Sequence, residues 1–147
     1  MKVFLLFTFF VPIAALGQDI PKFSNTILAR GVSFNQAKDS LLSQGYFIDQ
    51  QNEQDGTIIT KPKGVEKNDV RTIIIEVYVK DSIARITGRW NNNYNYRAQS
   101  GGLFSVDKTQ FTPVEYWRSG ISVPHKMFLI MDSYAKSMTS LISYEKL

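Results

Sequence analysis

The clearest pattern in the chain is an alternation of apolar and polar residues over residues 70–80 and 82–90. Successive side chains of a β-strand point to opposite faces, so this alternation predicts two strands that each bury one face. A two-residue turn at Asp81 and Ser82 joins them into a hairpin. The cross-strand pairs on its apolar face are Val79 with Ala84, Val77 with Ile86, Ile75 with Gly88 and Ile73 with Trp90. A shift of one residue destroys this sorting, so we expect this register, with Gly88 making room for the Trp90 indole.

Residues 33–45 carry the signals of a short amphipathic helix. Ser33 and Gln36 have the spacing of a capping box, in which Ser33 accepts from the backbone N–H three residues on and the Gln36 side chain reaches back. Gly45 is expected to end the helix in a left-handed conformation. The apolar residues at helical spacing between these ends are Phe34, Ala37, Leu41 and Leu42.

A second amphipathic helix is predicted near the C-terminus, with Pro124 close to its start. Apolar side chains recur there at spacings of three and four residues, which places them on one helix face. The stripe consists of Met127, Met131, Tyr134, Met138 and Leu141, widened by Phe128, Ile130, Ala135 and Ile142. We expect this stripe to pack on the apolar face of the hairpin, against Ile75, Val77, Ile86 and Trp90.

Shorter strands complete the predicted topology. They cover residues 25–32, 46–51 and 57–61, and residues 103–106 and 111–116 are candidates for further short strands. Asp55 and Gly56 favour a tight reversal between the second and third of these. The order β-α-β-β-β-β-α predicts an α+β fold, in which two helices pack on one face of an antiparallel sheet.

The first 17 residues predict a secretory signal peptide. Lys2 provides a positive charge, residues 3–16 form an apolar stretch, and small residues precede a cut between Gly17 and Gln18. An uncleaved membrane anchor is the alternative, but about 14 apolar residues are fewer than the roughly 20 that span a bilayer. We therefore expect a single α+β domain over residues 18–147, exported to the periplasm or secreted, with no transmembrane segment after signal removal.

Composition narrows the class of protein. The chain has no cysteine, which excludes disulfide frameworks, Cys-ligated metal sites and a cysteine nucleophile. It carries 17 Lys+Arg against 13 Asp+Glu, a net charge of +4, and loss of Lys2 with the signal peptide lowers this to +3. Such a modest charge on an exported protein argues against nucleic acid as a partner, although several Arg and Tyr residues would suit such a surface. These are Arg85, Arg89, Arg97, Arg118, Tyr78, Tyr94 and Tyr96.

Few residues in the sequence are candidates for catalysis or metal binding. The single histidine, His125, lies near a helix start, where an imidazolium is disfavoured, so we expect a surface or capping position. Asp49, Glu53 and Asp55 have the residue type of a glycosidase pair or a Ca²⁺ site, but they do not match the EF-hand pattern, and we expect a solvated hairpin tip. The sequence thus predicts no catalytic residue, no cofactor or metal site, and no enzyme activity.

The polar and aromatic run after the hairpin is the candidate site for a partner. Asparagine offers hydrogen-bond donors and acceptors, tyrosine and tryptophan offer rigid apolar area, and arginine offers a fork for an anion. A loop carried by a rigid hairpin is also a common place for a binding site. The candidate partner-binding residues are Asn91, Asn93, Tyr94, Asn95, Tyr96, Arg97 and Trp117. None of them is needed for the predicted core.

The order of elements resembles a known group of proteins. Residues 27–31, the capped helix after Ser33, residues 45–49 and 55–59, the hairpin over 73–90 and the final helix are similar to small exported bacterial domains with a TATA-binding-protein-like or BamC-like fold. Several of these are families of unknown function. The resemblance implies the α+β fold and carries no functional residue onto this chain.

Three functions remain open on the sequence. The first, which we favour, is a non-catalytic exported or envelope-associated binding module whose partner is a protein or glycan of the cell envelope. The second is a carrier of a small apolar ligand between the C-terminal helix and the sheet, since methionine adapts to irregular shapes. The third is a hydrolase. A closed core with an exposed aromatic patch would favour the first, and a cavity under the methionines the second.

Overall fold

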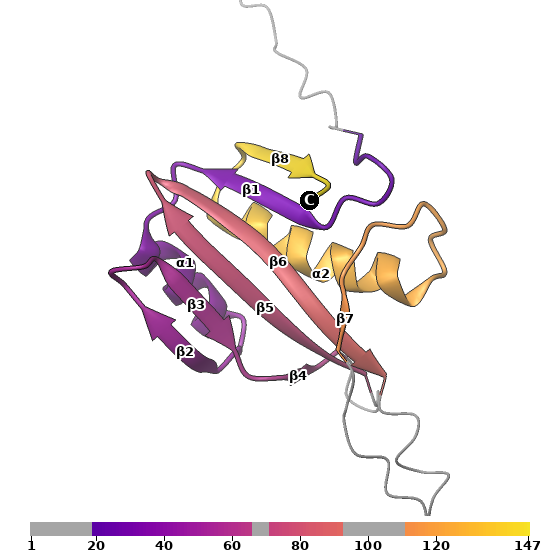
Figure 1. Ribbon diagram of the computed structural model, residues 1–147, viewed down its shortest axis with the longest axis horizontal. Helices are drawn as coiled ribbons and strands as arrows, with labels where there is room; N and C mark the ends of the chain where they lie inside the picture. Colours follow the sequence, from indigo (N-terminus) through magenta and orange to yellow (C-terminus); the bar gives the residue numbers. More distant parts are fainter. Residues whose placement is uncertain (1–18, 66–70, 93–110) are drawn as a thin grey trace, which may run out of the picture.

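The computed structural model describes residues 19–65, 71–92 and 111–147, which form one antiparallel sheet with two helices on one of its faces (Figure 1). The elements in chain order are β1 (Thr26–Arg30), α1 (Phe34–Ser43), β2 (Ile48–Asn52), β3 (Thr57–Thr60), β4 (Lys63–Gly64), β5 (Arg71–Lys80), β6 (Ile83–Asn92), β7 (Thr112–Pro113), α2 (Val123–Met138) and β8 (Ile142–Glu145). The strand order is β2-β3-β5-β6-β1-β8, with β4 paired to β5 and β7 to β6. The predicted α+β class is confirmed.

The hairpin of β5 and β6 has the predicted register throughout. Asp81 and Ser82 form its turn, and both have positive φ angles, of 51° and 58°. The expectation for Gly88 is wrong in one respect. A Cβ at Gly88 would lie 2.5 Å from the sulfur of Met131, so the glycine makes room for helix α2 and not for Trp90. The helix approaches the sheet closely at this point because β6 has no side chain there.

Helix α1 begins and ends as expected, with one difference in its capping. The Ser33 hydroxyl accepts from the Gln36 N–H at 3.2 Å, but the Gln36 side chain does not reach back, because its amide donates to the carbonyl of Met138 in α2. At the other end Gly45 has a φ of +75°. The N–H groups of Gly45 and Tyr46 donate to the carbonyls of Leu42 and Leu41, which closes the helix as a Schellman motif.

Helix α2 ends earlier than its apolar stripe predicts. It stops at Met138, and Thr139 has the extended angles φ −159° and ψ 155°. Leu141 and Ile142 therefore do not continue the helix: Leu141 is exposed, and Ile142 begins β8. Strand β8 pairs with β1, whose N–H and C=O groups would otherwise form an open sheet edge. This pairing explains why the chain leaves the helix where it does.

A buried carboxylate fixes β8 to α2. Asp132 is 5% exposed, and it accepts a hydrogen bond from the Tyr144 hydroxyl at 2.8 Å and forms an ion pair with Lys136 at 2.6 Å. Burial, and then the hydrogen bond to Asp132, raise the pKa of Tyr144 above its usual range, so the phenol remains the donor. The carboxylate thus has a partner for each oxygen, as a buried charge requires.

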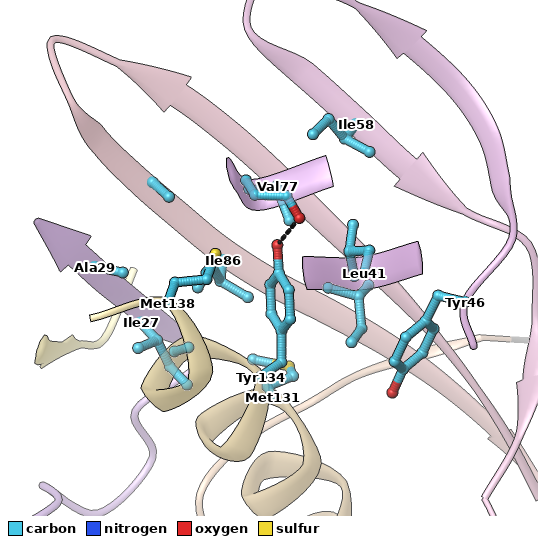
Figure 2. Close-up of a cluster of buried hydrophobic side chains, with 14 of the residues drawn as sticks. Ile27, Ala29, Leu41, Tyr46, Ile58, Val77, Ile86, Met131, Tyr134 and Met138 are labelled. Atoms are coloured by element: carbon cyan, nitrogen blue, oxygen red, sulfur yellow. Dashed lines mark hydrogen bonds between the residues drawn. The ribbon is translucent and has the colours of Figure 1, made fainter. Parts of the chain in front are cut away.

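The core lies between the helices and the inner face of the sheet (Figure 2). Tyr134 of α2 is fully buried there, and its hydroxyl donates to the carbonyl of Ala37 in α1 at 2.9 Å. Burial also raises the pKa of this phenol beyond its usual range. The side chains around it come from both helices and four strands, including Ile27, Leu41, Ile58, Val77, Ile86 and Met131. Tyr134 therefore joins the two helices inside the core.

Two expected short strands near the end of the sheet have different outcomes. Strand β7 lies within residues 111–116 and pairs with Arg89 and Trp90 of β6. Residues 103–106 lie outside the described residues. The neighbouring Val114 donates its N–H to the carbonyl of Gly88 at 2.9 Å and is fully buried, so this segment also covers the position where β6 lacks a side chain.

Candidate functional site

The predicted partner-binding residues separate in the structure. Asn91 lies in β6 opposite Thr72 and is only 6% exposed, so the expectation that it belongs to a free surface is wrong. The hairpin extends to Asn92, which places Asn91 inside the sheet instead of in a loop. Trp117 is 41% exposed. Asn93, Tyr94, Asn95, Tyr96 and Arg97 lie outside the described residues, and their role stays a prediction.

Trp117 belongs to a cluster that the sequence did not reveal. Its ring meets Phe23 edge to face, with the centroids 5.4 Å apart and the planes at 88°. Two ammonium groups lie over the same Phe23 ring, Lys22 at 4.7 Å and Lys146 at 5.3 Å from its centroid. We refer to Phe23, Trp117, Lys22 and Lys146 as the aromatic–lysine cluster. It brings together residues from both ends of the described chain.

Backbone contacts hold Phe23 in an unusual conformation. Its φ is +66°, a region that aromatic residues rarely adopt. The Phe23 N–H donates to the carbonyl of Tyr116 at 2.8 Å, and the Tyr116 N–H donates to the carbonyl of Ser24 at 2.7 Å. Such a conformation costs on the order of 1–3 kcal/mol and persists only where the surroundings enforce it. Here the enforced conformation places the Phe23 ring against Trp117.

The lysine from the C-terminal segment is positioned in a similar way. The Asn25 side chain binds the backbone of Leu147 twice, donating to its carbonyl at 2.9 Å and accepting from its N–H at 3.0 Å. This clamp fixes the residue next to Lys146. Among the residues that the structure describes, the ion pairs are Arg89 with Glu76 and Lys136 with Asp132, so neither lysine of the cluster has a carboxylate partner there.

A series of contacts between aromatic rings connects the segment that carries Trp117 to the core. Tyr116, next to Trp117, contacts His125 at 5.1 Å and Phe128 at 5.3 Å between ring centroids, and Phe128 is fully buried. The His125 ring donates from Nδ1 to the carbonyl of Trp117 at 2.6 Å. His125 itself is partly exposed in the first turn of α2, where Ser122 is the N-cap residue. Its contact helps to position the backbone of Trp117.

The other residues that the sequence offered for catalysis, metal binding or ligand binding do not form such a site within the described residues. Glu53 and Asp55 are exposed at the β2–β3 turn, where Asp55 accepts a hydrogen bond from Asn52, and Asp49 is exposed in β2. Within the described residues no three His, Cys, Asp or Glu side chains come together as metal ligands would. The methionines of α2 pack in the core: Met127 and Met131 are fully buried, and Met138 is 9% exposed.

An open polar groove of about 850 Å³ lies between α1 and α2. Hydroxyl, amide and carboxylate side chains line it, and three of them bond one another: the hydroxyls of Ser40 and Ser137 are 2.7 Å apart, and Gln44 donates to Ser137 at 3.0 Å. These bonds join the two helices across the groove. The groove differs from the apolar cavity that a ligand carrier would need.

Comparison with protein-family models and with curated proteins finds no match for this chain. In the described part of the chain, neither helix has the length and apolar character needed to cross a membrane. The interpretation of function therefore rests on the site itself.

Proposed function

We propose that this protein is an exported, non-catalytic, envelope-associated binding module that contacts its partner through the aromatic–lysine cluster. The observation that carries the proposal is the half-exposed Trp117, held against a Phe23 ring over which lie two lysines that have no carboxylate partner among the described residues. Exposed aromatic side chains in rigid positions are typical of recognition surfaces. The partner proposed from the sequence is a protein or glycan of the envelope.

The packing under α2 supports this function over that of a ligand carrier. Met127 and Met131 are fully buried among core residues, and the space that Gly88 leaves open is taken by Met131. An apolar ligand between helix and sheet would need a cavity at this place. The methionine stripe instead fills the core.

The contacts of His125 and Ser122 also favour a non-catalytic role. The Ser122 hydroxyl accepts a hydrogen bond from the backbone N–H of His125 at 3.4 Å, and it donates to the backbone carbonyl of Ser119 at 2.9 Å. The His125 ring is bonded through Nδ1 to a backbone carbonyl. A serine nucleophile would need its hydroxyl directed at the imidazole ring of a base, whereas both groups here serve to shape the chain around Trp117.

Export is predicted to leave Gln18 as the first residue of the mature protein. The signal peptide pattern of residues 1–17 is the reason, and Gln18 is also expected to cyclise in part to pyroglutamate. N-terminal mass spectrometry of secreted or periplasmic material checks the cut. Recovery of the protein with Met1 in a membrane fraction would contradict the prediction.

The resemblance to TATA-binding-protein-like or BamC-like domains likewise remains a proposal.

Capture of envelope components tests the proposed function. We expect Trp117→Ala to abolish most of the capture from an envelope extract, because truncation of a central tryptophan commonly lowers affinity tenfold or more, at about 1.4 kcal/mol per factor of ten. Tyr78→Ala is the matched control, since Tyr78 is 42% exposed and lies on the opposite face of the sheet from the helices. Tyr94→Ala/Tyr96→Ala/Arg97→Ala tests the polar run separately.

Melting temperatures accompany each capture measurement. Both single variants should melt within a few degrees of the wild type, because neither residue is part of the core. Equal capture by wild type and Trp117→Ala would contradict the proposed site. Loss of capture only in the triple variant would place the site in residues 94–97.

A further inference from the structure

An exposed aliphatic residue follows Trp117 of the aromatic–lysine cluster in the sequence. Ile121 is 91% exposed, four residues after Trp117 in the segment that joins β7 to α2. This segment projects at one end of the domain, beside the chain that leads into β1 (Figure 1). Leu129, on the second turn of α2, is 42% exposed. Exposed large apolar side chains in neighbouring segments are candidates for contacts with proteins or membranes.

Basic side chains lie in the same segments of the chain as these apolar residues and the cluster. Arg118 and Lys126 are exposed on either side of Ile121 in the sequence, in addition to Lys22 and Lys146 of the cluster. The same segments carry three carboxylates, Asp19, Glu115 and Glu145. None of the three forms an ion pair with a described basic residue. The four basic side chains thus exceed the acidic side chains by one, and two of them lie over the Phe23 ring that Trp117 also contacts.

We infer that this end of the domain docks on the surface of an anionic phospholipid membrane, with Ile121 and Trp117 entering the interface and the basic side chains at the headgroups. Tryptophan prefers the membrane interface because its ring is apolar and its N–H is polar. Lysine side chains place their stems along apolar groups and their ammonium groups toward water or phosphate. The inference rests on the proposed export, and it assigns membrane lipid to the cluster in place of the protein or glycan proposed from the sequence.

A lipid surface explains the site better than an acidic glycan does. A sugar ring would stack on the Trp117 indole and pair with the lysines, but it leaves Ile121 without a role. Conversely, a nearly fully exposed isoleucine in a polar turn gains free energy only where apolar surface receives it. Reversible binding by a peripheral protein also needs two contributions, apolar burial and attraction to anionic lipid, and both are present here.

Vesicle sedimentation with the intact mature protein tests the inference. We expect binding to phosphatidylglycerol-containing vesicles at low ionic strength, and about tenfold weaker binding to neutral phosphatidylcholine vesicles, since basic side chains near an anionic surface are attracted to it. Higher salt should weaken the first and leave the second nearly unchanged. Lys22→Gln/Lys146→Gln should reduce binding to the anionic vesicles about tenfold.

Ile121→Ser separates apolar insertion from charge. It should lower binding to anionic vesicles about tenfold, because part of an aliphatic side chain then no longer enters the interface. Leu141→Ser is the matched control: Leu141 is 63% exposed, but it follows the 16-residue helix α2, about 24 Å from the segment that precedes the helix. Both variants should keep the wild-type melting temperature.

The outcomes distinguish the inference from the proposed function. Loss with Ile121→Ser and not with Leu141→Ser supports membrane docking at this end. No binding to either type of vesicle overturns it, while capture of a protein or glycan that depends on Trp117 would leave the proposed function intact. Binding to an acidic polysaccharide but not to vesicles also overturns the lipid assignment. If neither vesicles nor envelope components bind, both proposals fail.

Discussion

Replacement of Tyr134 by alanine is expected to lower the free energy of unfolding by about 3–5 kcal/mol. The side chain is fully buried between α1, α2 and the sheet (Figure 2), so its removal leaves a large cavity. It also removes the hydrogen bond from the phenol to the carbonyl of Ala37. Such a loss is a large fraction of the roughly 5–15 kcal/mol that stabilise a typical domain.

Tyr134→Phe separates the two contributions. It keeps the ring and removes only the hydroxyl, so we expect a loss of about 1 kcal/mol. Urea denaturation of both variants measures the effect, and an unchanged m-value shows that the unfolded state is comparable. A loss below about 1 kcal/mol for Tyr134→Ala would mean that the contact between the two helices is not the one described.

Gly56→Ala is expected to be the most damaging single-methyl substitution among the described glycines, at about 3 kcal/mol or more. Gly56 has a φ of +71°, and a Cβ there would overlap the backbone carbonyl of Val79 in β5. The Val79 N–H donates to the Gly56 carbonyl at 2.8 Å. The added methyl group therefore forces apart two backbones that bond each other.

Gly31→Ala is the matched control for this effect. Gly31 has a nearly identical φ of +74°, but a Cβ at this position meets nothing within 4 Å. We expect about 1 kcal/mol for the left-handed conformation alone, partly offset by the lower entropy of the unfolded chain. Thermal or urea unfolding of the two variants gives the difference. Equal losses at both positions would show that conformation, and not contact with β5, decides the cost.

Local patterns in the sequence account for most of the secondary structure. The register of β5 and β6 follows from the alternation of apolar and polar residues, because a shift by one residue would bury polar side chains. The start of α1 at Ser33 and its end at Gly45 follow from capping preferences. In each case the residues that decide the structure are neighbours in the chain.

The predictions from the sequence that were wrong share a different cause. Helix α2 stops at Met138 because the next residues pair with β1, a strand more than 100 residues earlier. The Gln36 side chain binds Met138 instead of its own helix, and Gly88 accommodates Met131 instead of Trp90. Asn91 is buried because the hairpin continues past Trp90. All four depend on which distant segment lies alongside.

The candidate site also depends partly on local sequence and partly on tertiary contacts. Trp117 was identified from the sequence by residue type alone, as an aromatic residue suited to recognition. No local pattern links it to Phe23 and Lys22 near the start of the described residues, or to Lys146 near their end. The sequence by itself determined the fold class, the hairpin register and the two ends of α1, because these depend on side-chain periodicity and on backbone preferences of adjacent residues. Only the tertiary structure decided that Trp117 shares the Phe23 ring with two lysines, because β1 and β8 must pair before Lys22 and Lys146 come together.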